Sequence, residues 1–288
     1  MHFKKYKSIV LDNGTMNLTR GCIHGCIYCD SRSLCYQFMH PFTDIEIKEN
    51  ACEMLDGELT RKRKKIMIKT GAMSDPYMPI KEVLKLSRSC FEIIYKHGFG
   101  LSFQTKSTLF LDDLDLLEKI HNENRLVIQI TITTCDDDLC RKIEPGVEVT
   151  SERIEAMKIL KSYGIPVIVW LSPILPFIND QIENLKCILE KCYNVGVKGI
   201  IWYGPGLTLR AGNRDYFYRQ LDDVFPGLKK VYQKEFGNRY IVESRHKDLL
   251  NQYFIDYCES HKMMHNHKEI FDYINYFNEK KYEQLTLF

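Results

Sequence analysis

The chain has 288 residues, 44% of them hydrophobic and 27% charged, which is the composition of a folded globular protein and not of a disordered or fibrous one. No stretch approaches the roughly 18 apolar residues of a membrane-spanning helix, and residues 1–14 lack the apolar segment of a signal peptide, so we expect a cytoplasmic protein without a membrane partner. The net charge of +2 neither indicates nor excludes a nucleic-acid partner.

The first notable segment is TRGCIHGCIYCDS, in which three cysteines are spaced C-x3-C-x2-C. Three thiolates can hold three irons of a cubane cluster and leave the fourth iron open to bind and reduce a ligand. A structural zinc site would need a fourth ligand, for which His24 and Cys35 are candidates, but a second cysteine pair of the zinc-knuckle kind is not obvious. We therefore expect Cys22, Cys26 and Cys29 to bind an iron–sulfur cluster.

Eleven cysteines in a long chain without a signal peptide do not indicate a disulfide framework. Most of the eight outside the motif lie in apolar helical patterns. We expect these to be small core residues, among them Cys52, Cys90, Cys187 and Cys192.

After the cysteine segment, short β-type runs alternate with longer amphipathic stretches. Runs of apolar and β-branched residues predict strands at residues 65–72, 100–107, 125–134, 165–176 and 197–204. Helical periodicity predicts helices between them, at residues 80–98, 110–124, 151–164 and 181–196. The basic run RKRKK just before the first of these strands is expected to be a solvated helix end or loop.

Strands separated by helices of this length pair in parallel through βαβ crossovers. With a strand leading into the cysteine segment, about six βα units are predicted, and periodicity alone fits an open doubly wound sheet or a partial β/α barrel. In either fold the polar strand ends TGAMSD, QTKS, TITTCDD, LSP and YGPG would form the site. The alternation of predicted strands and helices ends near residue 212. We therefore expect a β/α domain over residues 1–212 and an aromatic-rich helical cap over residues 213–281.

The cysteine motif, with Tyr28 just before its third cysteine, is similar to the signature of radical S-adenosylmethionine enzymes. The resemblance implies a [4Fe–4S] cluster whose open iron binds S-adenosylmethionine. Reductive cleavage then yields a 5′-deoxyadenosyl radical that abstracts a hydrogen atom from a substrate. It also implies a reducing partner such as flavodoxin or ferredoxin, and a partial (β/α)6 TIM-type barrel, which decides between the two architectures.

Further segments resemble the branch that contains spore photoproduct lyase and related DNA repair photolyase-like proteins. NLTRGCIHGCIYCD resembles the branch's N-x-x-R-G-C-x-H-G-C-x-Y-C-Y, GAMSDPYMP its S/T-D-P-Y-Q-P, and QTKSTLFLDDLDLL its T-K-S…R-D-x-D-L-L. The stretch from KIEPG to PFIND also matches, so the resemblance spans residues 17–204. Within it, Asp75 and Pro76 fit a simple turn as well, and Glu144 and Arg153 a simple ion pair that braces a loop.

Carried over by position, the resemblance implies that Tyr28 lies beside the adenine of S-adenosylmethionine. It implies that Ser74, Lys106 and Thr131 help to hold this cofactor, because its carboxylate and ribose need hydroxyl and ammonium donors. Ordinary loop, turn and strand roles remain open for these three residues.

The sequence departs from this branch at two positions. Spore photoproduct lyases typically carry a hydrogen-donating cysteine beside the Ser-Asp pair and a tyrosine after the third cluster cysteine, where this chain has Met73 and Asp30. A thioether and a carboxylate cannot deliver a hydrogen atom as a thiol and a phenol do, so we do not expect repair of the spore photoproduct itself. Cys35 and Cys135 are candidates for another hydrogen-donating thiol, with a buried or incidental role as the alternative.

The chain ends in QLTLF, within a predicted tail of residues 282–288. This pentapeptide resembles the bacterial sliding-clamp-binding motif Q-L-[S/D]-L-F, whose apolar anchors enter a preformed pocket. The resemblance implies contacts from Gln284, Leu285, Leu287 and Phe288, and a tail folded back on the helical cap is the alternative.

Together these features predict a radical enzyme that acts on DNA in repair or modification and is recruited by the sliding clamp. The alternatives are a radical enzyme that modifies RNA, a peptide or a small molecule, and a noncatalytic clamp-associated iron–sulfur protein. Aromatic residues of the cap are candidates for stacking a flipped-out base, with core packing as the alternative: Tyr216, Phe217, Tyr218 and the run YFIDY.

Overall fold

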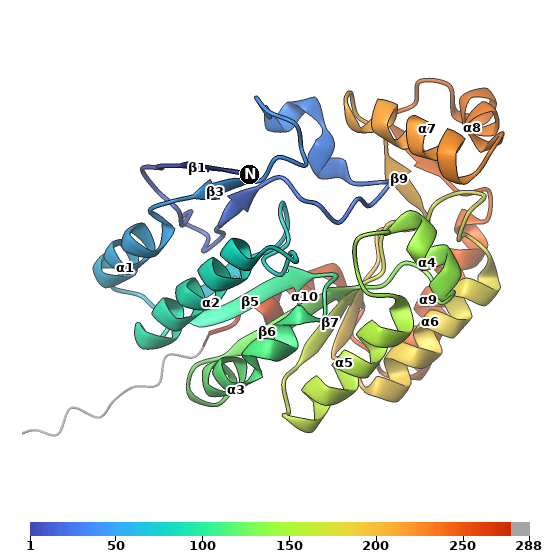
Figure 1. The fold of residues 1–288 in the computed structure, drawn as a ribbon. Helices are drawn as coiled ribbons and strands as arrows, with labels where there is room; N and C mark the ends of the chain where they lie inside the picture. Colours follow the sequence, from blue (N-terminus) through green and yellow to red (C-terminus); the bar gives the residue numbers. More distant parts are fainter. Residues whose placement is uncertain (278–288) are drawn as a thin grey trace, which may run out of the picture.

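A computed structural model describes residues 1–277 and centres on a parallel sheet of five strands in the order β4-β5-β6-β7-β8 (Figure 1). Each lies inside a run predicted from the sequence, and the bounds are β4 Met67–Thr70, β5 Gly100–Thr105, β6 Leu126–Thr131, β7 Val167–Trp170 and β8 Gly199–Ile201. Both faces of β5 and β6 are covered, so their residues are almost all buried. This explains why these runs are continuously apolar instead of alternating.

The helices that connect the strands pack on one face of the sheet. They are α2 Lys81–Lys96, α3 Leu114–Glu123 with the preceding 3-10 turn Leu109–Asp113, α5 Thr150–Ser162 and α6 Ile182–Val195. Their apolar stripes join the strand residues in the largest core cluster. The architecture confirms the partial β/α barrel, in which the carboxyl ends of all five strands meet at one edge.

The expected sixth strand, the one leading into the cysteine segment, is reduced to a bridge. Thr15 pairs in parallel with Lys69 of β4 at this point alone. The residues on either side of this bridge contribute to a separate small sheet in the order β1-β3-β2, with β1 at His2–Lys4, β3 at Glu46–Lys48 and β2 at Thr19–Arg20. Helix α1 Ala51–Arg61 follows this sheet, so the basic run after it begins at a helix end as predicted.

The segment after residue 212 contributes to three parts of the molecule. Helices α7 Asn213–Val224 and α8 Leu228–Phe236 pack over the cysteine segment, and α9 Lys247–Ser260 packs against α6. Helix α10 His267–Asn275 covers the face of the sheet opposite α2, α3 and α5 (Figure 1). An antiparallel pair of β9 Gly206–Thr208 and β10 Ile241–Glu243 adds strands that the periodicity does not predict.

Side chains of α10 fill the lower part of the barrel interior. Ile270 and Ile274 are buried against inward-facing residues of four strands, Met67, Val127, Ile168 and Ile201. Burial of a Val, Leu or Ile side chain contributes about 1.5–3 kcal/mol, so these contacts hold α10 against the sheet.

The cysteines outside the motif follow the prediction in part. Cys90 and Cys192 are buried as expected, and Cys52 is half-buried. The prediction is wrong for Cys187, which forms a disulfide with Cys135 because the loop after β6 passes over α6 at this point. None of the helices within residues 1–277 is both long and apolar enough to cross a membrane.

Candidate active site

A cavity of about 560 Å³ opens at the carboxyl ends of the strands. Its lining combines the three motif cysteines, the polar ends of β4, β5 and β6, and a wall from the segment after β8. A pocket of this size is ordinary for a small-molecule or cofactor site. The predicted residues that line it are Cys22, Cys26, Tyr28, Cys29, Ser74, Lys106 and Thr131.

Glycines let the cysteine segment wrap tightly. Gly21 and Gly25 both have positive φ, at 92° and 68°, which other residues rarely adopt. A Cβ on Gly21 would lie 2.4 Å from the carbonyl oxygen of Phe42. The backbone N–H of Cys22 donates to that same oxygen over 3.1 Å, so the loop around residue 42 holds the first cysteine.

The turn after α4 Asp137–Ile143 supports the segment from the other side. The N–H of Ile27 donates to the carbonyl of Ile143, and the N–H of Gly146 donates to that of His24, over 3.0 and 2.9 Å. A Cβ on Gly146 would lie 2.7 Å from that His24 oxygen. Only glycine therefore allows this approach of the two loops.

Ser74 ties the end of β4 to the cysteine segment. Its hydroxyl donates to the carbonyl of Gly21 over 2.6 Å, and it lies 2.6 Å from the hydroxyl of Thr19. The serine is buried and also lines the cavity. In this structure its hydroxyl positions the cysteine segment.

Asp75 links three parts of the site. Its carboxylate accepts hydrogen bonds from the Thr105 hydroxyl at 2.8 Å and from the backbone N–H groups of Tyr77 and Lys106 at 2.9 Å each. The same carboxylate lies 3.5 Å from Nδ1 of His24. A turn at Asp75 and Pro76 accounts only for the contact with Tyr77. The contacts with Thr105, Lys106 and His24 also fix the ends of β4 and β5 against the cysteine segment.

A buried chain of polar contacts lies beneath Tyr28. The hydroxyls of Tyr28 and Thr133 both donate to Oε1 of Glu144, while Nη2 of Arg153 lies 2.6 Å from Oε2. Burial favours a raised pKa for Glu144, but the charges of Arg153 and Lys106 outweigh it and lower the pKa. The predicted ion pair is confirmed, and it anchors a tyrosine of the motif.

Lys106 brings a positive charge to the cavity beside the cysteines. Its Nζ lies 5.8 Å from the centre of the Tyr28 ring. Burial lowers the pKa of Lys106, but the nearby Cys26 and Glu144 outweigh this and raise it. The ammonium suits the carboxylate of a cofactor, and Thr131 is a buried hydroxyl on the same wall.

The donor atoms fit an iron–sulfur cluster. All three motif cysteines are free thiols, and burial raises the pKa of Cys22 to about 12 and that of Cys26 further. A metal ion binds a cysteine as the thiolate, in place of the proton. Nε2 of His24, which lines the cavity, is buried without a hydrogen-bond partner among residues 1–277. The soft ligand set and this unpaired nitrogen fit a bound cluster and cofactor.

Asp30 lines the cavity but is held by its own surroundings. Its carboxylate accepts from the hydroxyls of Tyr36 and Ser33 at 3.1 Å each, and Nε of Arg210 lies 3.3 Å away. The side chain therefore organises the turn that follows the cysteine segment. Met73 lines the cavity as well.

The structure does not bring either candidate thiol to the cavity lining. Cys35 is exposed, and its sulfur accepts a hydrogen bond from Arg210 over 3.4 Å. The prediction that Cys135 is a hydrogen-donating thiol is wrong in this structure, because its sulfur is bonded to Cys187 and it lines a separate depression.

The aromatic cap residues pack instead of facing the cavity. Phe217 and Tyr218 are buried against the cysteine segment, and the hydroxyl of Tyr216 donates to the carbonyl of Gly25 over 3.3 Å. Phe254 of the YFIDY run is buried against the outer helices. These placements support core packing. The clamp-like residues Gln284–Phe288 lie outside the described residues.

A further part of the lining comes from the predicted strand end after β8, from β10 and from α9. Tyr203 is 56% exposed and lines the cavity, with its ring 5.9 Å from that of Trp170. Asn251 and an exposed ion pair between Lys247 and Glu243, 2.8 Å apart, complete this side. Asn251, Lys247 and Glu243 belong to α9 and β10 and are not predicted from the sequence, so only the fold brings these three residues to the mouth.

Comparisons with known proteins agree with this geometry. Residues 16–189 match the model of the Radical SAM superfamily. An uncharacterised protein of Methanocaldococcus jannaschii is 33% identical over 226 residues, which cover 77% of this chain and 81% of that protein.

Solved structures show the same fold. A cysteine-to-serine mutant of spore photoproduct lyase superposes with a TM-score of 0.64 at 14% identity, over 91% of this chain and 80% of that one. A double mutant of the lyase with bound AdoMet and dinucleoside spore photoproduct has a TM-score of 0.58 at 15% identity, over 86% and 74% of the chains. The cofactors of the Radical SAM superfamily are a [4Fe–4S] cluster and S-adenosylmethionine. This chain therefore belongs to the Radical SAM superfamily and has the fold of spore photoproduct lyase.

Proposed function

We propose that this radical S-adenosylmethionine enzyme acts on DNA, in the repair of a lesion or the modification of a base. One observation carries the proposal. A single cavity joins the three-cysteine segment to an exposed aromatic ring at the mouth, Tyr203. The similar fold of a spore photoproduct lyase with a bound dinucleoside lesion supports this choice of substrate class.

The chain's own residues divide the cavity into two ends. Cys22, Cys26 and Cys29 would hold the cluster, and Lys106 and Thr131 would hold the cofactor beside it. When bound, these groups supply a 5′-deoxyadenosyl radical that removes a hydrogen atom from the substrate, with electrons from a reducing partner such as flavodoxin or ferredoxin. At the cluster end, Phe217 and Leu221 of α7 pack with Cys26 and Tyr28 in one apolar cluster.

The opposite end fits the reacting part of a nucleic acid. A base in duplex DNA must be flipped out or single-stranded before it enters such a mouth. The Tyr203 ring, supported by Trp170 at 5.9 Å and by His267 at 4.6 Å, offers a face on which a base stacks. Asn251 adds an amide on the same wall.

The spore photoproduct itself is not the proposed lesion. Met73 and Asp30 line the cavity, and neither side chain donates a hydrogen atom. Asp30 is also engaged with Arg210 and Tyr36. A substrate whose reaction needs no hydrogen return from a protein thiol fits this lining.

Recruitment by the bacterial sliding clamp forms part of the proposal. The residues Gln284, Leu285, Leu287 and Phe288 match the anchor pattern of clamp ligands. Binding of this peptide to the clamp would keep the barrel close to clamped duplex DNA and raise its effective concentration there. Deletion of residues 284–288 is expected to abolish clamp binding and to leave cleavage of S-adenosylmethionine unchanged. Clamp binding by the truncated protein would refute this part.

The substrate class is tested by stimulation of cofactor cleavage. Reconstituted and reduced protein is incubated with S-adenosylmethionine and with duplex DNA, single-stranded DNA, RNA or a peptide mixture. We expect DNA carrying damaged or modified bases to accelerate the formation of 5′-deoxyadenosine. Acceleration by RNA or peptides alone would contradict the DNA assignment.

A further inference from the structure

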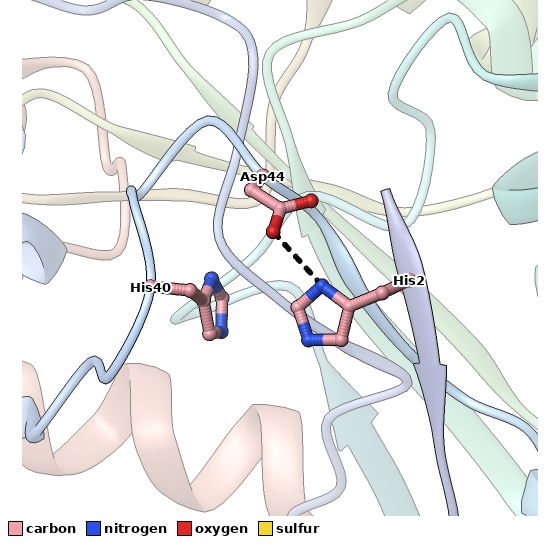
Figure 2. Close-up of side chains that lie close together, drawn as sticks. All are labelled: His2, His40 and Asp44. Atoms are coloured by element: carbon pink, nitrogen blue, oxygen red, sulfur yellow. Dashed lines mark hydrogen bonds and ion pairs between the residues drawn. The ribbon is translucent and has the colours of Figure 1, made fainter.

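A cluster of imidazole and carboxylate side chains lies on the small N-terminal sheet, outside the cavity. His2 of β1, His40 and Asp44 each place one ligand atom within 4.8 Å of the other two (Figure 2). The rings of His2 and His40 lie edge to face with centres 4.7 Å apart. Oε2 of Glu46, in β3, lies 3.5 Å from Nε2 of His2 and 3.7 Å from Nε2 of His40.

The hydrogen bonding of His40 directs a lone pair into this cluster. Nδ1 of His40 lies 3.1 Å from the carbonyl oxygen of Pro41. A carbonyl oxygen only accepts, so Nδ1 carries the proton and Nε2 is the basic nitrogen of the neutral ring. Nε2 is buried and has no hydrogen-bond partner within residues 1–277. A nitrogen lone pair and a carboxylate oxygen that face each other in this way can share a bound cation.

His2 is oriented in the same way. Its Nδ1 lies 3.0 Å from Oδ2 of Asp44, the contact drawn as a dashed line in Figure 2. Donation from Nδ1 to this carboxylate leaves Nε2, the nitrogen nearer to Glu46, free to bind a metal. A carboxylate that fixes the far nitrogen of a histidine ligand is the usual outer support of such sites.

From this arrangement we propose a binding site for a divalent transition-metal ion of the zinc type. Nε2 of His2, Nε2 of His40 and a carboxylate oxygen of Glu46 are the protein ligands, and Asp44 orients His2. Imidazole and carboxylate ligands suit such an ion. Tetrahedral ligands at zinc lie roughly 3.3 Å apart, so the distances from Glu46 to the two nitrogens need to shorten only slightly.

Two positively charged groups lie at the edge of the cluster. Nζ of Lys4 is 3.4 Å from the same Glu46 oxygen, and the amino group of Met1 is 2.6 Å from Asp44. The Lys4 side chain is 56% exposed, so it can move aside into solvent when a metal ion binds. The hydroxyl of Tyr6 donates to the other oxygen of Glu46 and holds the carboxylate in place.

The position of the site suggests a structural role. His40 and Asp44 flank Phe42, whose carbonyl oxygen accepts the N–H of Cys22 over 3.1 Å. An ion between His2 and His40 would fasten β1 to this loop and thereby stiffen the support of the first cluster cysteine. The ion does not face the cavity, because neither histidine lines it.

Zinc content and zinc coordination test the proposal on the untagged, full-length, cluster-reconstituted protein. After exposure to zinc and desalting, we expect one tightly held zinc per chain. X-ray absorption at the zinc edge is expected to show only nitrogen and oxygen ligands at about 2.0–2.1 Å, without the sulfur shell near 2.3 Å that cysteine ligation gives. His40→Gln is expected to lose this zinc, and Asp44→Asn to weaken binding about 10- to 100-fold.

The exposed His246 provides the matched control. His246→Gln is expected to retain the zinc, and zinc is expected to raise the thermal midpoint of the parent but not of His40→Gln. Circular dichroism of the zinc-free variants verifies that they are folded. A sulfur-containing zinc shell, or zinc retention that is unaffected by His40→Gln in a folded variant, would overturn the proposal.

Discussion

Glu144 and Arg153 form an ion pair of 2.6 Å in which both side chains are almost completely buried. The pair stands between the loop that supports the cysteine segment and the start of α5, and its carboxylate also accepts the hydroxyl of Tyr28. Guanidinium, carboxylate and phenol thus satisfy one another away from water. The pair connects the stability of the barrel to the orientation of the motif tyrosine.

Removal of one partner of this pair is expected to destabilise the protein strongly. Glu144→Gln or Arg153→Met should lower the free energy of unfolding by about 3–5 kcal/mol, because the remaining charged or polar group stays buried without its partner. Chemical denaturation measures this. The exposed pair of Lys158 and Glu155, at 2.6 Å, is the control, and Glu155→Gln should cost at most about 1 kcal/mol. Equal effects at the two sites would contradict the role assigned to burial.

The same pair predicts a dependence of stability on pH. The folded-state pKa of Glu144 is lowered, so the unfolded state takes up the proton first as pH falls. The stabilisation is therefore complete above the unfolded-state pKa of about 4.3 and is lost as pH falls through the folded-state pKa. Free energies of unfolding measured from neutral to acidic pH should decline more steeply in the parent than in Glu144→Gln. Parallel curves would argue against the lowered pKa.

Ser74 is expected to act through the cysteine segment. Ser74→Ala leaves the buried carbonyl of Gly21 without its donor, which costs about 1–3 kcal/mol. We expect lower iron retention after reconstitution, measured as iron per chain on repeated desalting. Ser162→Ala, at an exposed serine near the end of α5, should retain iron like the parent. Unchanged iron retention in Ser74→Ala would assign its hydroxyl a different role.

Tyr203 is expected to contribute to the substrate end of the cavity. Loss of base stacking costs about 1–3 kcal/mol per base, so Tyr203→Ala should weaken binding of a DNA substrate roughly 5- to 150-fold. Tyr203→Phe keeps the ring and should bind nearly as the parent does. Fluorescence anisotropy with labelled single-stranded DNA measures both variants. Weakening in the phenylalanine variant equal to that in the alanine variant would show that the ring does not stack.

Much of the barrel could be predicted from local sequence patterns. The five strands of the sheet are runs of apolar residues ended by glycine or polar residues, and their helices have clear apolar stripes, so periodicity finds them. The position of α10 could not be found this way. Its stripe, with Ile270 and Ile274, indicates a buried face but not that the face enters the barrel interior. The short strand β10 pairs with the distant β9. Its three residues are too few to show the alternation of apolar and polar residues that predicts a strand.

The site could be predicted where its residues form a contiguous motif. The cysteines, Tyr28 and Lys106 lie in recognisable segments, and the fold brings them to one cavity. The hydrogen-bonding roles of Asp75 and His24 depend on contacts between separate loops, which spacing does not reveal. The disulfide of Cys135 is a pairing over 52 residues and has no local signal.

The most direct test of the central claim is reductive cleavage of S-adenosylmethionine. Anaerobically reconstituted and reduced parent protein should hold about four irons and form 5′-deoxyadenosine, quantified by liquid chromatography with mass spectrometry. The variant with Cys22→Ala, Cys26→Ala and Cys29→Ala should lose both the iron and the product, because no other set of free thiols lines the described cavity. Product formed by this variant at the parent's rate would contradict the account.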